Sequence, residues 1–217
     1  MTPTRHLLGA ALWAATLPVF ASPCPPTTNG ALTAQYEVRY SPRDGAPATQ
    51  TWLLRREADR LAWRRGDVED VWLRQPDGVR LLRVFHADRQ VTDYAPGELK
   101  ALGVAVPWDE LTGLLATSQL SRLTATGTHY SGVLGSEAVT VDWDAAAGLP
   151  ARLARRSDQA EVQFVRTTCT AGAAVATDFA GYGHIDAADF GDMAYDPFVR
   201  KAMAYDERQG WREAHAH

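Results

Sequence analysis

Short segments in which apolar and polar residues alternate strictly constrain the fold of this chain more than any other feature. In the segment 32–40, LTAQYEVRY, every second residue is apolar or aromatic and those between are mostly charged or polar. A period of two puts the apolar residues on one face, so this segment is predicted to be a half-buried β-strand. Similar segments follow, separated by Gly-Asp, Ala-Asp and Pro-Asp-Gly groups that suit tight hairpins. The pattern predicts a meander of roughly nine to eleven antiparallel strands.

Helical signals interrupt this pattern between the two strand-rich halves and again near the end. The segment YAPGELKALG favours a single turn after Pro96, and PWDELTGLLAT places Trp108 and Leu111 on one apolar stripe. Further on, Asp196 and Pro197 are typical of the N-cap and first position of a helix. The expected fold class is therefore mainly β with covering helices (α+β). We expect an unclosed antiparallel β half-barrel with a helical lid and a C-terminal helix.

The first 21 residues have the character of a cleaved secretory signal. Arg5 and His6 precede a short apolar run, which ends in Val19, Phe20 and Ala21. A retained anchor is the alternative, which the short run and its proline disfavour. Pro23 stands before Cys24, so a lipid-anchored N-terminus is not expected. These features predict export to the periplasm, with no transmembrane segment in the mature chain.

Two cysteines remain after the predicted cleavage, Cys24 and Cys169. In an oxidising compartment a lone pair most often forms one disulfide, which is the expected state. Two unpaired thiols are the alternative.

The predicted domain division follows from these patterns. Residues 1–21 form the signal, 22–177 form the β half-barrel, and 178–217 form an acidic C-terminal segment with a short helix and a frayed tail that contains histidines. The strand pattern ends at Cys169, so the acids beyond it are expected to lie outside the barrel. The formal net charge is -4, and arginines alternate with acids rather than gathering on one face, so no nucleic-acid partner is expected.

Sequence motifs of catalysis are missing from the chain. It has no nucleophile elbow, phosphate loop, His-Glu-x-x-His or paired-cysteine motif. His86 and His129 are strand histidines that could act as bases, but a surface or partly buried role is more common. No catalytic residue and no cofactor are predicted, and a cofactor-free enzyme stays open as an alternative.

Large apolar side chains recur on the predicted strands and on the middle helix. A curled sheet that presents them on its concave face either packs a helix there or holds an apolar ligand. The candidates for lining such a site are Tyr36, Trp52, Trp63, Trp72, Phe85, Trp108, Leu111, Trp143 and Phe164.

The order of these segments resembles the periplasmic lipoprotein-carrier (LolA/LolB-like) superfamily. The resemblance rests on WLLRREADRLAW, on VWLRQPDGVRLLRVFHADRQVTDYAP and on VTVDWDAAAGLPARLARR, and spans residues 31–168. It implies a β half-barrel that binds acyl chains or other apolar groups. In the lipoprotein chaperone an Arg-Pro pair supplies the arginine that latches the lid; Arg56 is the nearest match, although Glu57 replaces the proline.

Two readings of function follow. The first is an exported carrier for a lipid, an acyl chain or a lipoprotein, with another envelope protein docking on the C-terminal segment as a further partner. The second is an exported metal-binding or metal-delivery factor that uses the acidic C-terminal segment. Its candidate ligands are His184, Asp186, Asp189 and Asp192, although their spacing suits helical turns and capping better than a calcium loop.

Overall fold

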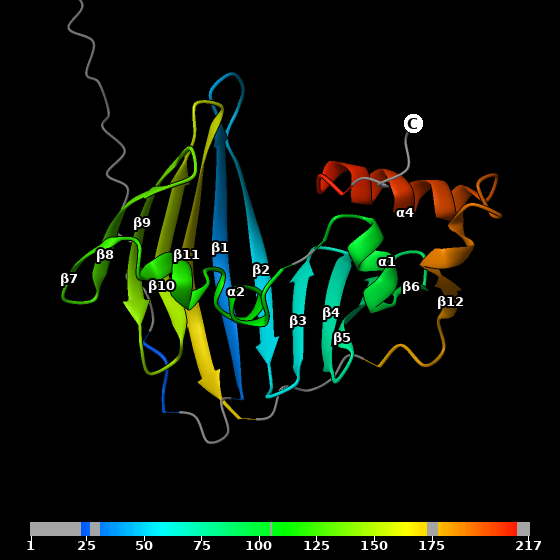
Figure 1. The fold of residues 1–217 in the computed structure, drawn as a ribbon, viewed down its shortest axis with the longest axis horizontal. Coiled ribbons are helices and arrows are strands. Elements are labelled where there is room, and N and C mark those ends of the chain that lie inside the picture. The colour runs from blue at the N-terminus through cyan, green and yellow to red at the C-terminus, as the bar shows by residue number, and fades with distance from the viewer. Residues whose placement is uncertain (1–22, 27–30, 105, 173–177, 212–217) are drawn as a thin grey trace, which may run out of the picture.

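Twelve strands form one open sheet in the computed structural model of the protein. The structure describes residues 23–26, 31–104, 106–172 and 178–211; the predicted signal and the histidines of the tail lie outside these residues. The strand order is β12-β6-β5-β4-β3-β2-β1-β11-β10-β9-β8-β7, with β12 and β7 at separate edges (Figure 1). All neighbours pair antiparallel except β12 and β6. The sheet is therefore unclosed, and the predicted fold class is confirmed.

The strands are β1 (Leu32–Pro42), β2 (Ala48–Arg56), β3 (Arg60–Arg65), β4 (Val68–Gln75), β5 (Gly78–Phe85), β6 (Gln90–Tyr94), β7 (Thr124–Thr126), β8 (His129–Leu134), β9 (Glu137–Asp144), β10 (Leu149–Arg156), β11 (Ala160–Ala171) and β12 (Gly183–Asp186). The helices are α1 (Pro96–Ala101), α2 (Trp108–Gly113), α3 (Thr117–Leu120), the 3-10 helix η1 (Ala187–Phe190) and α4 (Pro197–Arg208).

The apolar residues of the alternating pattern form the inner face of the sheet, which is the face that the helices cover. In β1, Leu32, Ala34, Tyr36 and Val38 are all buried, while the polar residues between them are half-buried or exposed. Tyr40 continues the apolar face but is 45% exposed. The hairpin of β1 and β2 extends past the helices in Figure 1.

The half of the sheet made of β3 to β6 is covered on both faces. Its outer face carries a small core of Ala62, Val71, Val84 and Val91, against which Phe179 and Tyr182 pack. Its inner face packs against α4, as described below. Two-sided burial explains why the sequences of β4 and β5 contain apolar runs instead of a simple alternation.

The C-terminal segment contributes to the sheet in a way that the sequence did not predict. After β11 the chain reaches the far edge, where β12 pairs in parallel with β6. η1 and α4 follow, and α4 begins at Asp196 and Pro197 as predicted. The acids of this segment are thus joined to the barrel through a strand, although the division at residue 178 itself stays a prediction.

Candidate apolar site on the inner face

An aromatic group occupies the middle of the inner face. Trp52 lies between Trp63 and Phe164, with ring centroids 5.9 and 5.3 Å away, and Trp63 lies 6.0 Å from Tyr36. These four side chains come from β1, β2, β3 and β11, which are neighbours in the sheet. The first three strands follow one another in the sequence, and β11 comes from the far half of the chain. The inner face therefore gathers four of the nine candidate lining residues.

The helix α2 carries two further candidates, Trp108 and Leu111, and both pack against the same core. Trp63 Nε1 donates a hydrogen bond to the carbonyl of Leu111 at 3.1 Å. Trp143 of β9 reaches α2 at Gly113, where an added Cβ would lie 3.3 Å from its ring. These three candidates therefore belong to the same part of the site as the aromatic group.

Trp72 and Phe85 lie in the other half of the inner face. Trp72 contacts Trp211 with a centroid distance of 6.3 Å, and Phe85 contacts Phe198 and Tyr205 of α4 at 5.2 and 5.8 Å. The structure thus divides the nine candidates into seven that lie on α2 or against it and two that contact α4 or the residues just after it. Tyr36, Trp63, Trp72, Phe85 and Phe164 are all less than a tenth exposed, so side chains fill the site in this conformation.

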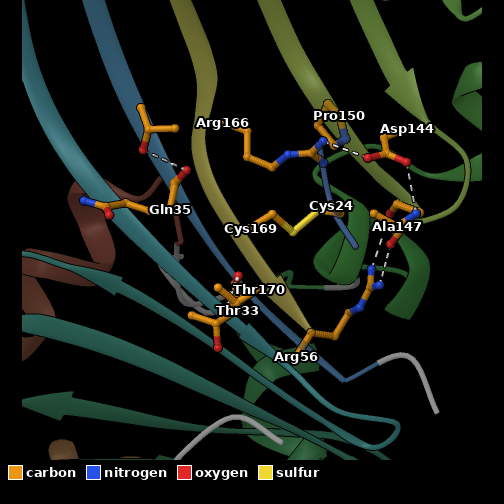
Figure 2. The surroundings of a disulfide bond; sticks show 12 residues. Cys24, Thr33, Gln35, Arg56, Asp144, Ala147, Pro150, Arg166, Cys169 and Thr170 are labelled. Carbon is orange, nitrogen blue, oxygen red and sulfur yellow. Dashed lines mark hydrogen bonds and ion pairs between the residues drawn. A yellow bond between two sulfur atoms is a disulfide. The ribbon is translucent and has the colours of Figure 1, made fainter. Parts of the chain in front are cut away.

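Three side chains hold α2 and its C-terminal end through backbone carbonyls. Besides Trp63, Arg56 donates to the carbonyl of Thr112 at 3.4 Å and Arg155 to that of Leu114 at 3.0 Å. Leu114 has φ of 61°, the left-handed region that branched side chains rarely adopt. Arg56 also donates to Ala147, as Figure 2 shows. The candidate latch residue therefore contacts the covering helix, and its role as a latch stays a prediction.

A buried ion cluster, made of Arg65, Asp70, Arg83 and Asp206, fastens α4 to the sheet. Arg83 of β5 is fully buried; its Nε lies 2.6 Å from Asp70 Oδ1 of β4, and its Nη1 pairs with Asp206 of α4. Arg65 of β3 also pairs with Asp70. Tyr94 donates to Asp206 at 2.9 Å. Two cations and two carboxylates balance the formal charge of the cluster.

The two carboxylates of the cluster have opposite pKa shifts. Burial alone would raise the pKa of Asp70, but the guanidinium groups of Arg83 and Arg65 outweigh it and hold this pKa below its ordinary value. Burial also raises the pKa of Asp206. The opposing effect of the Arg83 guanidinium is smaller there, so this pKa stays above its ordinary value. In Asp206 the loss of solvation therefore outweighs the neighbouring positive charge, whereas in Asp70 the positive charges outweigh it.

The sequence did not single out this cluster. Arginine and aspartate within a strand usually face solvent, so the interleaving of arginines with acids does not by itself indicate a buried cluster. A usable signal was present, since Asp70, Arg83 and Arg65 all occupy inward positions in the alternation of their strands.

Near the middle of the sheet, the segment that holds Cys24 is tied to β11. Cys24 and Cys169 form the predicted disulfide, with a Cα–Cα distance of 4.9 Å (Figure 2). Beside it, buried Arg166 donates to Asp144 at 2.7 Å. Burial alone would raise the pKa of Asp144. The hydrogen bonds that its carboxylate accepts from Arg166 and from the amide of Ala147 outweigh burial and hold this pKa below its ordinary value.

The acidic C-terminal segment uses its carboxylates for capping. Asp186 accepts from the amide of Ala188 at the start of η1, and Asp196 accepts from the amides of Phe198 and Val199 at the start of α4. Asp189 and Asp192 are exposed, and the His184 ring lies tilted against that of Phe179, with centroids 6.4 Å apart. In the described ranges, no group of three or more His, Cys, Asp or Glu residues is arranged to hold a metal ion.

The strand histidines lie on the outer face of the sheet. His86 bridges Glu69 Oε2 at 3.0 Å and the hydroxyl of Tyr182 at 3.3 Å, so it anchors the segment that covers this face. His129 lies 2.8 Å from Asp142 Oδ1 in a groove of about 280 Å³ across β9 to β11. Both therefore lie across the sheet from the aromatic group.

Comparisons with known proteins return a structural likeness alone. No family model and no curated protein matches the chain. The fold is similar to the crystal structure of the LolA superfamily protein NE2245 from Nitrosomonas europaea, with a TM-score of 0.31 and 11% identity over 72% of this chain and 91% of that chain. A likeness of this size assigns neither family nor function, so the superfamily resemblance stays a prediction.

The helices of the described ranges are short. None of them is both long enough and apolar enough to cross a membrane.

Proposed function

We propose that the protein is an exported carrier that binds an apolar group of a lipid, an acylated peptide or a lipoprotein on the inner face of its sheet. The observation that carries this proposal is the aromatic group of Tyr36, Trp52, Trp63 and Phe164 beneath a helix of only six residues. A helix this short has little stability of its own, so its position depends on the contacts described above.

Binding would require α2 to move, because side chains fill the inner face in the closed conformation. The hydrogen bonds from Arg56, Trp63 and Arg155 end on backbone carbonyls, so they can break without leaving a buried charge unpaired on the helix. The carrier thus exchanges contacts with α2 for contacts with the ligand. Arg56 acts in this proposal as a latch that keeps the empty site closed.

The disulfide supports an oxidising compartment, since such bonds persist in exported proteins and are rare in the cytosol. Together with the signal predicted over residues 1–21, it favours the periplasm. The proposal involves binding and transfer, with no chemical step.

Native mass spectrometry of the mildly purified protein, followed by titration of the delipidated protein with a dansyl-labelled fatty acid, tests the proposal. We expect a co-purified lipid or saturable probe binding. Replacing Arg56 by Gln should speed probe association several-fold, whereas Arg74→Gln, a change at an exposed strand arginine, should leave it unaltered. A protein that carries no lipid and binds no probe would refute the carrier function.

A further inference from the structure

Two buried nitrogen donors on the inner face have no acceptor among the described residues. They are Trp52 Nε1 and Arg65 Nε. A buried donor without a partner costs about 1–3 kcal/mol, so proteins seldom retain one without a reason. Two such donors on adjacent side chains indicate a place where a bound molecule could supply the missing hydrogen-bond acceptor.

The two side chains are neighbours across the strand pair. Trp52 of β2 and Arg65 of β3 are register partners, and the Arg65 guanidinium carbon lies 5.3 Å from the centroid of the Trp52 ring. The other two nitrogens of Arg65 are already used, since Nη2 pairs with Asp70 and Nη1 donates to Gln209 Oε1 at 3.2 Å. The guanidinium is therefore held in place, with Nε left to donate.

This pair lies between the two coverings of the inner face. Trp52 packs against Trp63, which is hydrogen bonded to α2, and Arg65 lies 5.9 Å from the ring of Tyr205 on α4. A ligand with its chain on the aromatic group beneath α2 would bring one polar end close to this boundary. An oxygen acceptor on that end could satisfy both donors.

The charge of the surroundings favours a neutral acceptor. Arg65 and Arg83 are balanced by Asp70 and Asp206, so the cluster carries no net formal charge. A carboxylate placed there would add an uncompensated buried negative charge, which is costly. An ester carbonyl accepts hydrogen bonds without adding charge.

We propose that Trp52 and Arg65 recognise the ester carbonyl of an acyl chain bound on the inner face. This inference rests on the proposed carrier function and specifies its ligand as an acyl ester in preference to a free fatty acid or a plain alkyl chain. The aromatic group provides affinity for the chain, and the two donors provide the selectivity.

Calorimetric titration with three ligands of equal chain length, each below its critical micelle concentration, tests this assignment. The ligands are dodecanoyl lysophosphatidylcholine, dodecylphosphocholine, which shares its head group but has no ester, and dodecanoate. We expect the lysolipid to bind about five- to tenfold more tightly than the other two, the gain of a hydrogen bond or two.

The variants Trp52→Phe and Arg65→Lys then assign the effect to the two donors. Each should weaken lysolipid binding about five- to tenfold and leave dodecylphosphocholine binding within about twofold, because only the ester loses its partner. Arg74→Lys, a change at an exposed strand arginine outside the site, is the matched control and should change neither. Thermal unfolding of each variant verifies that it is folded.

The outcomes separate the two proposals. If all three ligands bind with equal affinity to the wild-type protein and to Trp52→Phe, the carrier function survives and ester recognition is wrong. Tighter binding of dodecanoate than of the lysolipid would also overturn it, in favour of a carboxylate site. If none of the three binds, the carrier function itself fails.

Discussion

At the scale of single residues, the most consequential feature is a group of charged side chains buried in a sheet whose other contacts are mainly apolar. Arg83 is fully buried, flanked by Tyr205 at 4.7 Å and Trp211 at 4.3 Å, and paired with carboxylates from a strand and a helix. Removing one member of such a cluster leaves its partners desolvated and unpaired. The cluster therefore makes the seating of α4 depend on ionisation.

The opposite pKa shifts of Asp70 and Asp206 predict opposite effects of two similar substitutions. The folded-state pKa of Asp70 is lowered, so its contribution to stability is present above its ordinary pKa of 3.8 and is lost as the pH falls through the folded-state value. The pKa of Asp206 is raised, so its contribution is full below 3.8 and is lost as the pH rises. Urea unfolding of Asp70→Asn and Asp206→Asn across the acid range measures both.

We expect the stability advantage of the wild-type protein over Asp70→Asn to shrink as the pH falls below about 4, and its advantage over Asp206→Asn to shrink as the pH rises above it. The two variants are each other's control, since each removes one carboxylate from the same cluster. Differences that change in the same direction with pH would contradict the assigned shifts.

Sequence reasoning recovered the residues of the inner face but not their grouping. Alternation shows that Trp63 and Trp72 face inward, because that depends on local backbone geometry. It does not show that Trp63 lies beneath α2 and Trp72 against Trp211, because each neighbourhood is created by segments far away in the chain. The unpaired donors of Trp52 and Arg65 were out of reach for the same reason, since satisfaction of a donor depends on everything packed around it.

At the scale of elements, the ends of helices were easier to predict than the edge of the sheet. Asp196 and Pro197 act within one turn, so their pattern specifies the start of α4 locally. β12 is four residues long and without alternation, and it forms a strand because the edge of β6 offers unpaired backbone groups. The sequence Gly-His-Ile-Asp contains no local pattern that predicts a strand paired with β6.

The capping role of Asp196 gives a prediction for α4. Asp196→Ala removes the acceptor for two amides and should lower the free energy of unfolding by about 1 kcal/mol. Asp192→Ala, a change at an exposed acid of the same segment, should stay within about 0.5 kcal/mol of wild type. Urea unfolding at neutral pH distinguishes the two. Equal losses for both variants would show that the acids act together, as a shared ion site would require.

At the scale of the whole molecule, the first and eleventh strands form the centre of the sheet. β1 pairs with β2 on one side and with β11 on the other, so the two strand-rich halves of the sequence meet along this pair. The disulfide joins the same region, since Cys169 lies opposite Ala34 of β1. Its closed loop spans a sequence separation of 145 residues.

Removal of the disulfide should therefore be costly. The double variant Cys24→Ser, Cys169→Ser should lose about 4 kcal/mol of unfolding free energy, mostly because the unfolded chain regains the freedom of a long loop. Urea unfolding under oxidising conditions measures the loss. Wild-type protein unfolded in the presence of reductant should shift to the same midpoint, and a persistent difference between the two would mean that the serines disturb the folded state.

The central position of the β1–β11 pair also governs how the chain reaches its fold. Contacts between residues so distant in sequence must overcome a large loop-closure entropy before they bring any gain, which makes sheets of this topology slow to form. In an unfolded chain whose disulfide is intact, the segment before β1 is already held next to the C-terminal part of β11. We therefore expect the covalent link at Cys24 and Cys169 to bring β1 and β11 together first, after which the hairpins on either side can add to the sheet by local steps.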